Sequence, residues 1–272
     1  MTRHEGPIVV GIDGTALIAG SVNAAIEFGA WEAMRRHVDL RLVLAYDTDI
    51  ASCNTLERLV TRTVAAYPGL DVTGDLHSGS AANGLVARSA TATVVVMCAD
   101  TRVHYGGLQA GLVSVQVAAH SHAPVIVVPA PRTRPPSDDR ALVVVGIDGS
   151  LGCADAIAFA FEEAAAREAR LHAVFAWDKA TQPAAGIGPA ADEMLHQATD
   201  VWAHKYPDVS LLHSALGGTN PVQALGDAAA KADLIVVGAR GAGGFDALEL
   251  GSVSDGLVRY ARTNIAVVRN AS

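Results

Sequence analysis

The sequence predicts an α/β fold made of two tandem domains, each with an open parallel sheet between two layers of helices. The first observation is an internal repeat, because VVGIDGT at residues 9–15 returns as VVGIDGS at residues 144–150. The second is that strand-length apolar runs alternate with Ala-rich helical segments in both halves. Such alternation implies right-handed crossovers and a parallel sheet that is covered on both faces.

The second copy begins with consecutive valines, which indicate a strand buried on both faces of a sheet. Pro207 ends the second helix of this copy, and Pro221 lies in the first turn of the third. The expected strands cover residues 141–147, 171–177, 209–213, 234–237 and 265–268. The expected helices cover residues 154–170, 190–204, 221–230 and 252–261.

The first copy follows the same plan, except that its first loop and helix are together four residues longer. Its expected strands cover residues 8–12, 40–45, 72–76, 93–97 and 125–128. The last strand of each copy is apolar and carries no charge, so it would promote aggregation at an open sheet edge. We expect these two strands to pair in an intramolecular pseudo-dimer, although helices could cover each edge instead. A homodimer of whole chains is also compatible with the sequence.

Proline content marks the boundary between the copies. Four prolines lie among the polar residues 129–140, which is typical of a stiff, extended linker. Two units of roughly 130 residues match the usual size of a domain. We therefore expect a first domain at residues 1–129, a linker at residues 130–140 and a second domain at residues 141–272.

Charge and cysteine content narrow the functional class. The formal net charge is -8, whereas nucleic-acid-binding proteins need a basic face to neutralise phosphates. The three cysteines are too few and too scattered for a disulfide framework or a zinc site. The apolar runs are shorter than the ~20 residues of a membrane span, and the first strand follows too closely on Met1 for a signal peptide. We expect a cytoplasmic protein that neither binds nucleic acid nor spans a membrane.

A glycine-rich segment follows the fourth strand of the second copy. Gly238 and Gly241 are followed, after nine further residues, by Gly251 and Ser252 at the start of a predicted helix. Glycine lets the main chain approach a ligand closely, and the N–H groups and dipole of a helix start favour a phosphate. Ligands of open α/β sheets bind beyond the carboxyl ends of the strands. The segment therefore predicts a phosphate site, to which Ser252 and Ser254 add hydroxyl donors.

The whole chain resembles the tandem universal stress proteins of actinobacteria. The resemblance rests on both repeats and on the spacing Gly238-x2-Gly241-x9-Gly251-Ser252, which fits the ATP-binding motif of that family. It implies a Rossmann-like sandwich with strand order 3-2-1-4-5 and ATP bound across the ends of the first and fourth strands. Mg²⁺ can accompany ATP as its counter-ion. An adenine nucleotide is thus the expected small-molecule partner, while the protein partner stays open.

The resemblance also implies roles for individual residues of the second copy. Asp148, which is followed by Gly149, would hold the adenosine, and the main chain at Ala176 would face the adenine. The residues expected along the phosphates and the ribose are Gly238, Arg240 and Gly241. The residues expected at the phosphate tail are Gly251, Ser252, Val253 and Ser254.

Three of these residues have structural interpretations as well. Asp148 can accept main-chain N–H bonds in an Asp-Gly turn. Ser252 can be a helix N-cap without any contact to a ligand. Arg240 can be a solvated loop charge.

The first copy departs from the motif. The repeat alignment puts Cys98, Thr101 and Leu112 in place of two glycines and one serine, and Asp100 adds negative charge where a polyphosphate would lie. We therefore expect this copy to bind ATP weakly or not at all, unless the loop at residues 101–110 compensates. The residues of the weak or vestigial site are Asp13, Ala45, Gly111 and Ser114.

Other conspicuous residues are expected to be structural. Four aromatic residues on Ala-rich helices are expected in the core: Phe28, Trp31, Phe159 and Phe161. His120 and His122 lie two apart at a helix end and cannot share a helical face, so we expect no metal site there. Cys98 and Cys153 are expected in loops near the clefts, as buried small residues rather than redox sensors.

The leading functional hypothesis is an ATP-binding regulatory protein. No general base, metal cluster or activated nucleophile accompanies the phosphate loop, so efficient catalysis is not expected. The family resemblance implies a role in adaptation to stress or dormancy. Two other classes stay open. One is slow ATP hydrolysis or autophosphorylation, with Ser252 or Ser254 as acceptor, and the other is an interaction module with empty clefts.

Overall fold

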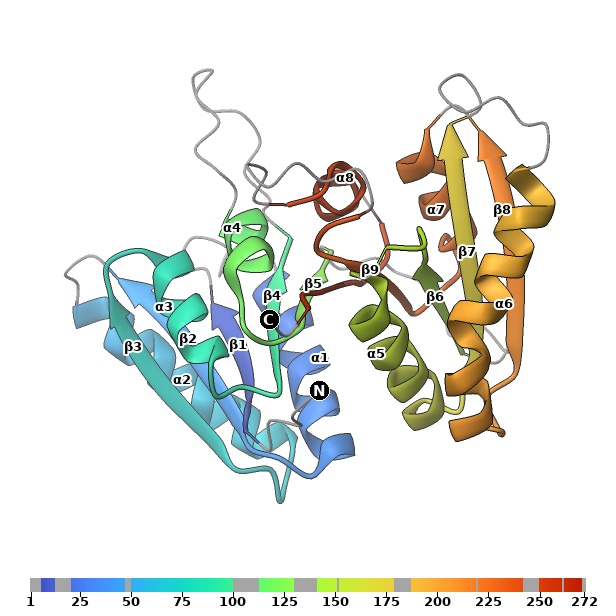
Figure 1. Cartoon of the computed structure of the whole chain (residues 1–272). Coiled ribbons are helices and arrows are strands. Elements are labelled where there is room, and N and C mark those ends of the chain that lie inside the picture. The colour runs from blue at the N-terminus through green and yellow to red at the C-terminus, as the bar shows by residue number, and fades with distance from the viewer. Residues whose placement is uncertain are drawn as a thin grey trace. The chain divides into compact units, whose positions relative to one another are not determined.

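The chain folds into two compact units, Met1–Thr133 and Arg134–Ser272. The computed structural model (Figure 1) describes residues 6–12, 21–46, 50–99, 113–129, 141–150, 152–178, 187–218, 220–241, 250–260 and 262–270. The predicted linker, residues 130–140, lies outside the described residues. No helix in the described part of the chain is long and apolar enough to cross a bilayer.

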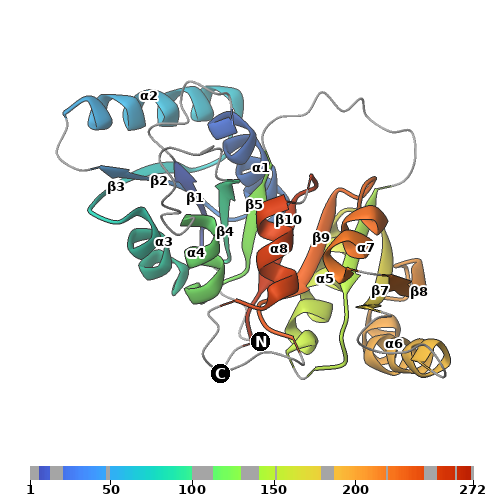
Figure 2. The same ribbon diagram turned by 90° about the horizontal axis from the view of Figure 1, so that it is seen from above.

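The first unit is a parallel sheet with the strand order β3-β2-β1-β4-β5. Its strands are β1 (Ile8–Ile12), β2 (Leu40–Tyr46), β3 (Val72–Ser78), β4 (Val94–Cys98) and β5 (Val125–Val128). Its helices are α1 (Ser21–Arg36), α2 (Ile50–Ala66), α3 (Ala81–Ser89) and α4 (Val113–His120). Helices α1 and α2 cover one face of the sheet, and α3 and α4 cover the other (Figure 2).

The second unit repeats this plan with the order β10-β9-β6-β7-β8. Its strands are β6 (Leu142–Gly146), β7 (Arg170–Asp178), β8 (Leu211–Gly218), β9 (Leu234–Gly238) and β10 (Ile265–Val268). Its helices are α5 (Cys153–Ala166), α6 (Ile187–Lys205), α7 (Pro221–Ala228) and α8 (Ser252–Tyr260). Helices α5 and α6 pack on one face, and α7 and α8 on the other. Within each unit the order is 3-2-1-4-5, which confirms the predicted fold class.

The central strands are buried on both faces, as their continuous apolar runs predicted. All five residues of β1 and of β4 are buried. Phe159 and Phe161 on α5 are fully enclosed, as expected of core residues. The core assignment is wrong for Trp31, which is 44% exposed and lies under the guanidinium of Arg35 at 4.8 Å from its centroid. The cation covers part of the ring in place of core packing.

Several predicted boundaries differ from the structure, and two of them differ by four residues or more. The first helix of the second copy ends at Ala166 because Glu168 takes a positive φ of 51°, and β7 then begins at Arg170. Strand β8 runs from Leu211 to Gly218, beyond the expected end at residue 213. Its second half contains residues with low strand propensity. Pairing with β7 as far as Asp178 holds it in the sheet.

Candidate functional site

Three segments of the second unit meet beyond the carboxyl ends of β6 and β9. Asp148 follows β6, Gly241 follows β9, and Gly251 comes directly before α8. A Cβ atom on Gly241 would collide with Oδ2 of Asp148. The N–H of Gly251 donates to the carbonyl oxygen of Ala239 at 2.8 Å. The structure therefore brings together residues that lie about a hundred positions apart and that were all predicted to bind one ligand.

The Asp148 carboxylate is held in a tight turn. Its Oδ1 accepts hydrogen bonds from the Ser150 N–H at 3.0 Å, the Ser150 hydroxyl at 2.6 Å and the Cys153 thiol at 2.7 Å. Gly149 has a φ of 76°, in the region that favours glycine. The turn interpretation of Asp148 is thus confirmed. The same turn directs the other carboxylate oxygen, Oδ2, toward Gly241.

Cys153 was expected to be a small buried residue near the cleft, but its contact with the Asp148 carboxylate was not predicted. It was expected in a loop, but it is the first residue of α5, and only 5% of it is exposed. Burial raises the pKa of the Cys153 thiol, so the sulfur stays protonated and can donate to Asp148. Its spacing of five residues after Asp148 was the available signal. A five-residue spacing alone does not show which way a cysteine points.

The glycines of the motif allow main-chain segments to pack against each other. A Cβ atom on Gly238 would lie 3.2 Å from the carbonyl oxygen of Gly152. A Cβ atom on Gly251 would lie 3.3 Å from the carbonyl oxygen of Ala239 and 3.5 Å from the amide nitrogen of Gly241. The distances to the two carbonyl oxygens are shorter than ordinary van der Waals contact, so a Cβ atom at either glycine would require the facing main chain to shift.

The two serines in the first turn of α8 lie in different environments. Gly251 accepts the first helical bond from the Asp255 N–H at 2.8 Å, so Gly251 is the N-cap and Ser252 follows it as the first helical residue. The N-cap interpretation of Ser252 is therefore wrong, and its side chain is exposed. Ser254 is 4% exposed and donates from Oγ to the carbonyl oxygen of Gly238 at 2.6 Å.

The other predicted residues of the second unit surround these segments. Ala176 is half-buried in β7, where it pairs with Leu216. Val253 is half-buried in α8, and Arg240 is exposed, as a solvated loop charge would be. The N–H of Ile147 donates to Val174 at 2.9 Å, which keeps the end of β7 beside the turn at Asp148.

The first unit carries a different residue at the equivalent strand end. Cys98 ends β4 opposite Val128, just as Gly238 ends β9 opposite Val268. The next residue donates to the facing strand in both units, at 2.7 Å from Ala99 and at 2.8 Å from Ala239. Cys98 is thus a buried strand residue, whereas a loop position was expected.

The remaining residues predicted for the first unit are only partly described. Ala45 is half-buried in β2, and Ser114 is buried in the first turn of α4. Asp13 and Gly111 lie outside the described residues. Exposed positions at the end of α4 and just after it are confirmed for His120 and His122.

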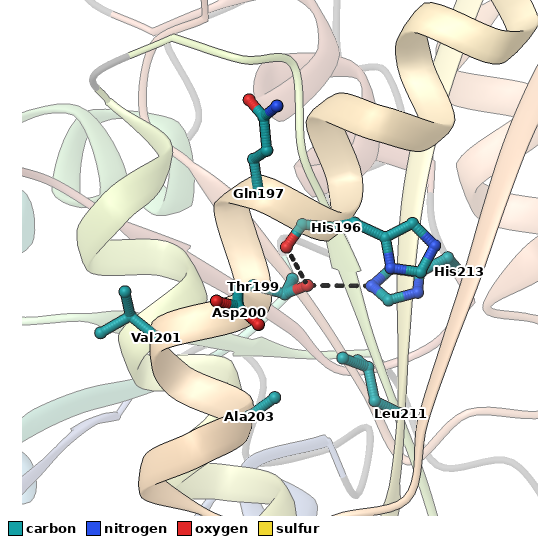
Figure 3. Close-up of a pocket in the computed structure, with 8 residues that line it drawn as sticks. All are labelled: His196, Gln197, Thr199, Asp200, Val201, Ala203, Leu211 and His213. Carbon is teal, nitrogen blue, oxygen red and sulfur yellow. Dashed lines mark hydrogen bonds between the residues drawn. The ribbon is translucent and has the colours of Figure 1, made fainter.

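A hollow of about 380 Å³ lies between α6 and β8 and includes none of the predicted site residues (Figure 3). The rings of His196 and His213 face each other there with centroids 4.1 Å apart, and Thr199 Oγ1 lies 2.9 Å from Nε2 of His213. Burial and the nearby His196 and His172 lower the pKa of His213, which favours the neutral form of the His213 ring. Within the described ranges, no cluster of three or more metal-ligating side chains could hold an ion.

Comparisons with known proteins agree with this geometry. The model of the universal stress protein family matches residues 142–269. A universal stress protein of Mycobacterium tuberculosis H37Rv is 28% identical over 97% of this chain and 96% of its own length. Another from the same strain is 29% identical over 99% of both chains. The crystal structure of a universal stress protein from Archaeoglobus fulgidus covers 99% of this chain with a TM-score of 0.74 at 15% identity, and covers 98% of that chain.

Proposed function

Because this chain belongs to the universal stress protein family, we propose that it is a regulatory protein that binds ATP in its second unit. Nucleotide occupancy would bias the conformation of the protein or its choice of partner during adaptation to stress or dormancy. That physiological role follows from the family. The binding site is argued from the residues of this chain.

The observation that carries the proposal is the meeting of Asp148, Gly241 and Gly251 at one edge of the sheet. Strand β6 lies between β7 and β9 in the sheet. The chain continues from β6 to β7 and β8 on one side, and then crosses to β9 on the other side of β6. Open α/β sheets bind ligands at such a switch point. A carboxylate on one side and a glycine-rich helix start on the other match the two ends of a nucleotide.

Each end of the site suits a different part of ATP. The Asp148 carboxylate can accept hydrogen bonds from ribose hydroxyls, and the main chain at Ala176 lies on the adenine side. The phosphates would lie along Gly238, Arg240 and Gly241 and end at α8. The nine-residue helix α8 offers the unpaired N–H groups and positive dipole of its first turn, to which exposed Ser252 adds a hydroxyl. Mg²⁺ would enter with the nucleotide as its counter-ion.

The proposal assigns weaker nucleotide binding, or none, to the first unit. Cys98 occupies the strand end where Gly238 lies in the second unit, and a Cβ atom at Gly238 would press on the carbonyl oxygen of Gly152. A side chain at the position of Cys98 therefore disfavours the close main-chain packing that the proposed site of the second unit uses. Asp148 also has a hydroxyl and a thiol donor that fix its orientation in the second unit.

Nucleotide extracted from the purified protein, together with calorimetric titration by ATP, tests this function. Wild-type protein should bind ATP, and Gly251→Leu should not, because the leucine would separate Gly251 from Ala239 and Gly241. Gly226→Ala is the matched control, since a Cβ there meets no atom within 4 Å. A wild-type protein that binds no adenine nucleotide would rule out the proposal and leave the interaction-module hypothesis.

A further inference from the structure

Trp177, the second-last residue of β7, has a buried polar atom that the fold itself does not use. The residue is 8% exposed, and its ring stacks on Phe175 with centroids 5.7 Å apart. Its indole Nε1 is shielded from solvent and finds no hydrogen-bond acceptor within the described part of the chain. A buried indole N–H usually has a partner, because leaving it unsatisfied costs its lost hydration.

The strand register places this N–H at the adenosine end of the proposed site. Trp177 follows Ala176 directly, and its side chain alternates to the face shared by Ala173 and Phe175. Helix α6 covers that face, because His213, the strand partner of Ala173, contacts Thr199 of α6. Gly149, next to Asp148, lies under the same helix, since a Cβ on Gly149 would lie 3.6 Å from the Met194 sulfur. Both residues therefore lie under α6 at the end of the sheet where the base is expected.

We propose that the Trp177 indole N–H donates a hydrogen bond to a ring nitrogen of the bound purine base. This inference rests on the proposed ATP site and names a residue that selects the base. Indole is a donor only, so it favours a base that presents an unprotonated nitrogen at that position. Because Nε1 is shielded in this structure, the indole or the atoms that cover it must move to let the base reach it. Binding should therefore alter the environment of this one tryptophan.

A purely structural role is the alternative. In that case the ring packs on Phe175 as part of the core, and its N–H is an unused donor that gains nothing from nucleotide. Trp177→Phe separates the two roles, because it keeps an aromatic ring and removes the N–H. Trp202→Phe is the matched control, since Trp202 lies on α6 against Tyr206 and Lys205 and outside the proposed site.

The experiment compares ATP with its 1-deaza, 3-deaza and 7-deaza analogues, each of which lacks one ring nitrogen acceptor. Trp177→Phe should weaken ATP binding by about five- to tenfold, the usual loss for one hydrogen bond. One analogue should weaken wild-type binding by a similar factor and show no further loss in Trp177→Phe. Trp202→Phe should behave as wild type with all four ligands.

A second measurement does not depend on how the variant folds. In the ¹⁵N-labelled wild-type protein, the Trp177 indole N–H resonance should move downfield with ATP and should lack this downfield shift with the one analogue that binds more weakly. Equal ATP affinity in wild type and Trp177→Phe, or an unmoved indole resonance, would overturn the inference while leaving ATP binding intact. Absence of ATP binding by wild type would overturn the proposed function and this inference together.

Discussion

Ser254 donates a hydrogen bond from its buried hydroxyl to the carbonyl oxygen of Gly238 at 2.6 Å. The bond joins the first turn of α8 to the last residue of β9, sixteen positions earlier in the chain. Because Gly251 is bonded to Ala239 as well, the start of α8 is fixed to the end of β9 at two points. These two bonds place the start of α8, where we propose that the phosphates bind, against the end of β9.

Replacing Ser254 by alanine should lower the free energy of unfolding by about 1–3 kcal/mol, because the Gly238 carbonyl would lose its buried donor. ATP affinity should fall as well, because α8 would no longer be held against β9. Urea unfolding and calorimetric titration measure the two effects. A variant with wild-type stability would show that the bond contributes nothing to the fold.

Ser252→Ala is the counterpart of that variant, because Ser252 is exposed and only two residues away. Its unfolding free energy should stay within about 0.5 kcal/mol of wild type, as is usual at surface positions. Its ATP affinity should nevertheless fall, since a hydroxyl donor to the phosphates is lost. Unchanged affinity would remove Ser252 from the site, and loss of the same size for ADP and AMP would place it away from the terminal phosphate.

Gly241→Ala should abolish or strongly reduce ATP binding, because its Cβ atom would displace the carboxylate of Asp148. Gly226 lies on α7, where a Cβ atom would meet no other atom within 4 Å. Gly226→Ala should raise the unfolding free energy by about 0.5–1 kcal/mol, because alanine favours the helix more than glycine does. ATP titration of both variants checks the prediction. If Gly241→Ala binds ATP with wild-type affinity, ATP binding does not depend on the position that Gly241 leaves open for the Asp148 carboxylate.

The histidine pair between α6 and β8 should make stability depend on pH. Burial, His196 and His172 lower the pKa of His213 below its ordinary value near 6.5, against the opposing effect of Asp192. The unfolded chain then takes up a proton more readily than the folded one. The stability that neutral His213 contributes is present above about pH 6.5 and is lost as the pH falls toward its folded-state pKa.

Urea unfolding between pH 5 and 8 checks this dependence. His213→Gln should flatten the decrease of unfolding free energy below about pH 6.5. His204→Gln is the control, because His204 lies on α6, the helix that carries His196, and its side chain is 78% exposed. Parallel pH profiles for wild type and His213→Gln would contradict the account of this pocket.

The fold could be predicted from the sequence because its determinants are local. The runs of valine in β1, β4, β6 and β9 and the alternating helical segments determine a doubly wound sheet without knowledge of distant contacts. The second half of β8 could not be predicted, since Ala215, Gly217 and Gly218 have low strand propensity and pairing with β7 holds them. Trp31 was misassigned because an arginine covers its ring from one helical turn away.

The site was predictable in its residue types and less so in their roles. The glycine spacing indicated Gly238, Gly241 and Gly251, since close main-chain packing needs glycine wherever the partners lie. The role of Ser254 depends on a partner sixteen residues away, and that of Cys153 on the side chain of Asp148. Spacing along the chain does not encode either partner. The predicted pairing of the two closing strands stays a prediction.

The measurement that tests the central claim most directly is the number of ATP molecules bound per chain, by calorimetry, in wild type, Asp148→Ala and Asp13→Ala. Asp13 occupies in the first copy the position of Asp148 in the second, so the two variants are matched. The account predicts one site in wild type, no binding in Asp148→Ala and unchanged binding in Asp13→Ala, with circular dichroism showing folded protein throughout. Two sites in wild type, or a site that survives in Asp148→Ala and disappears in Asp13→Ala, would contradict it.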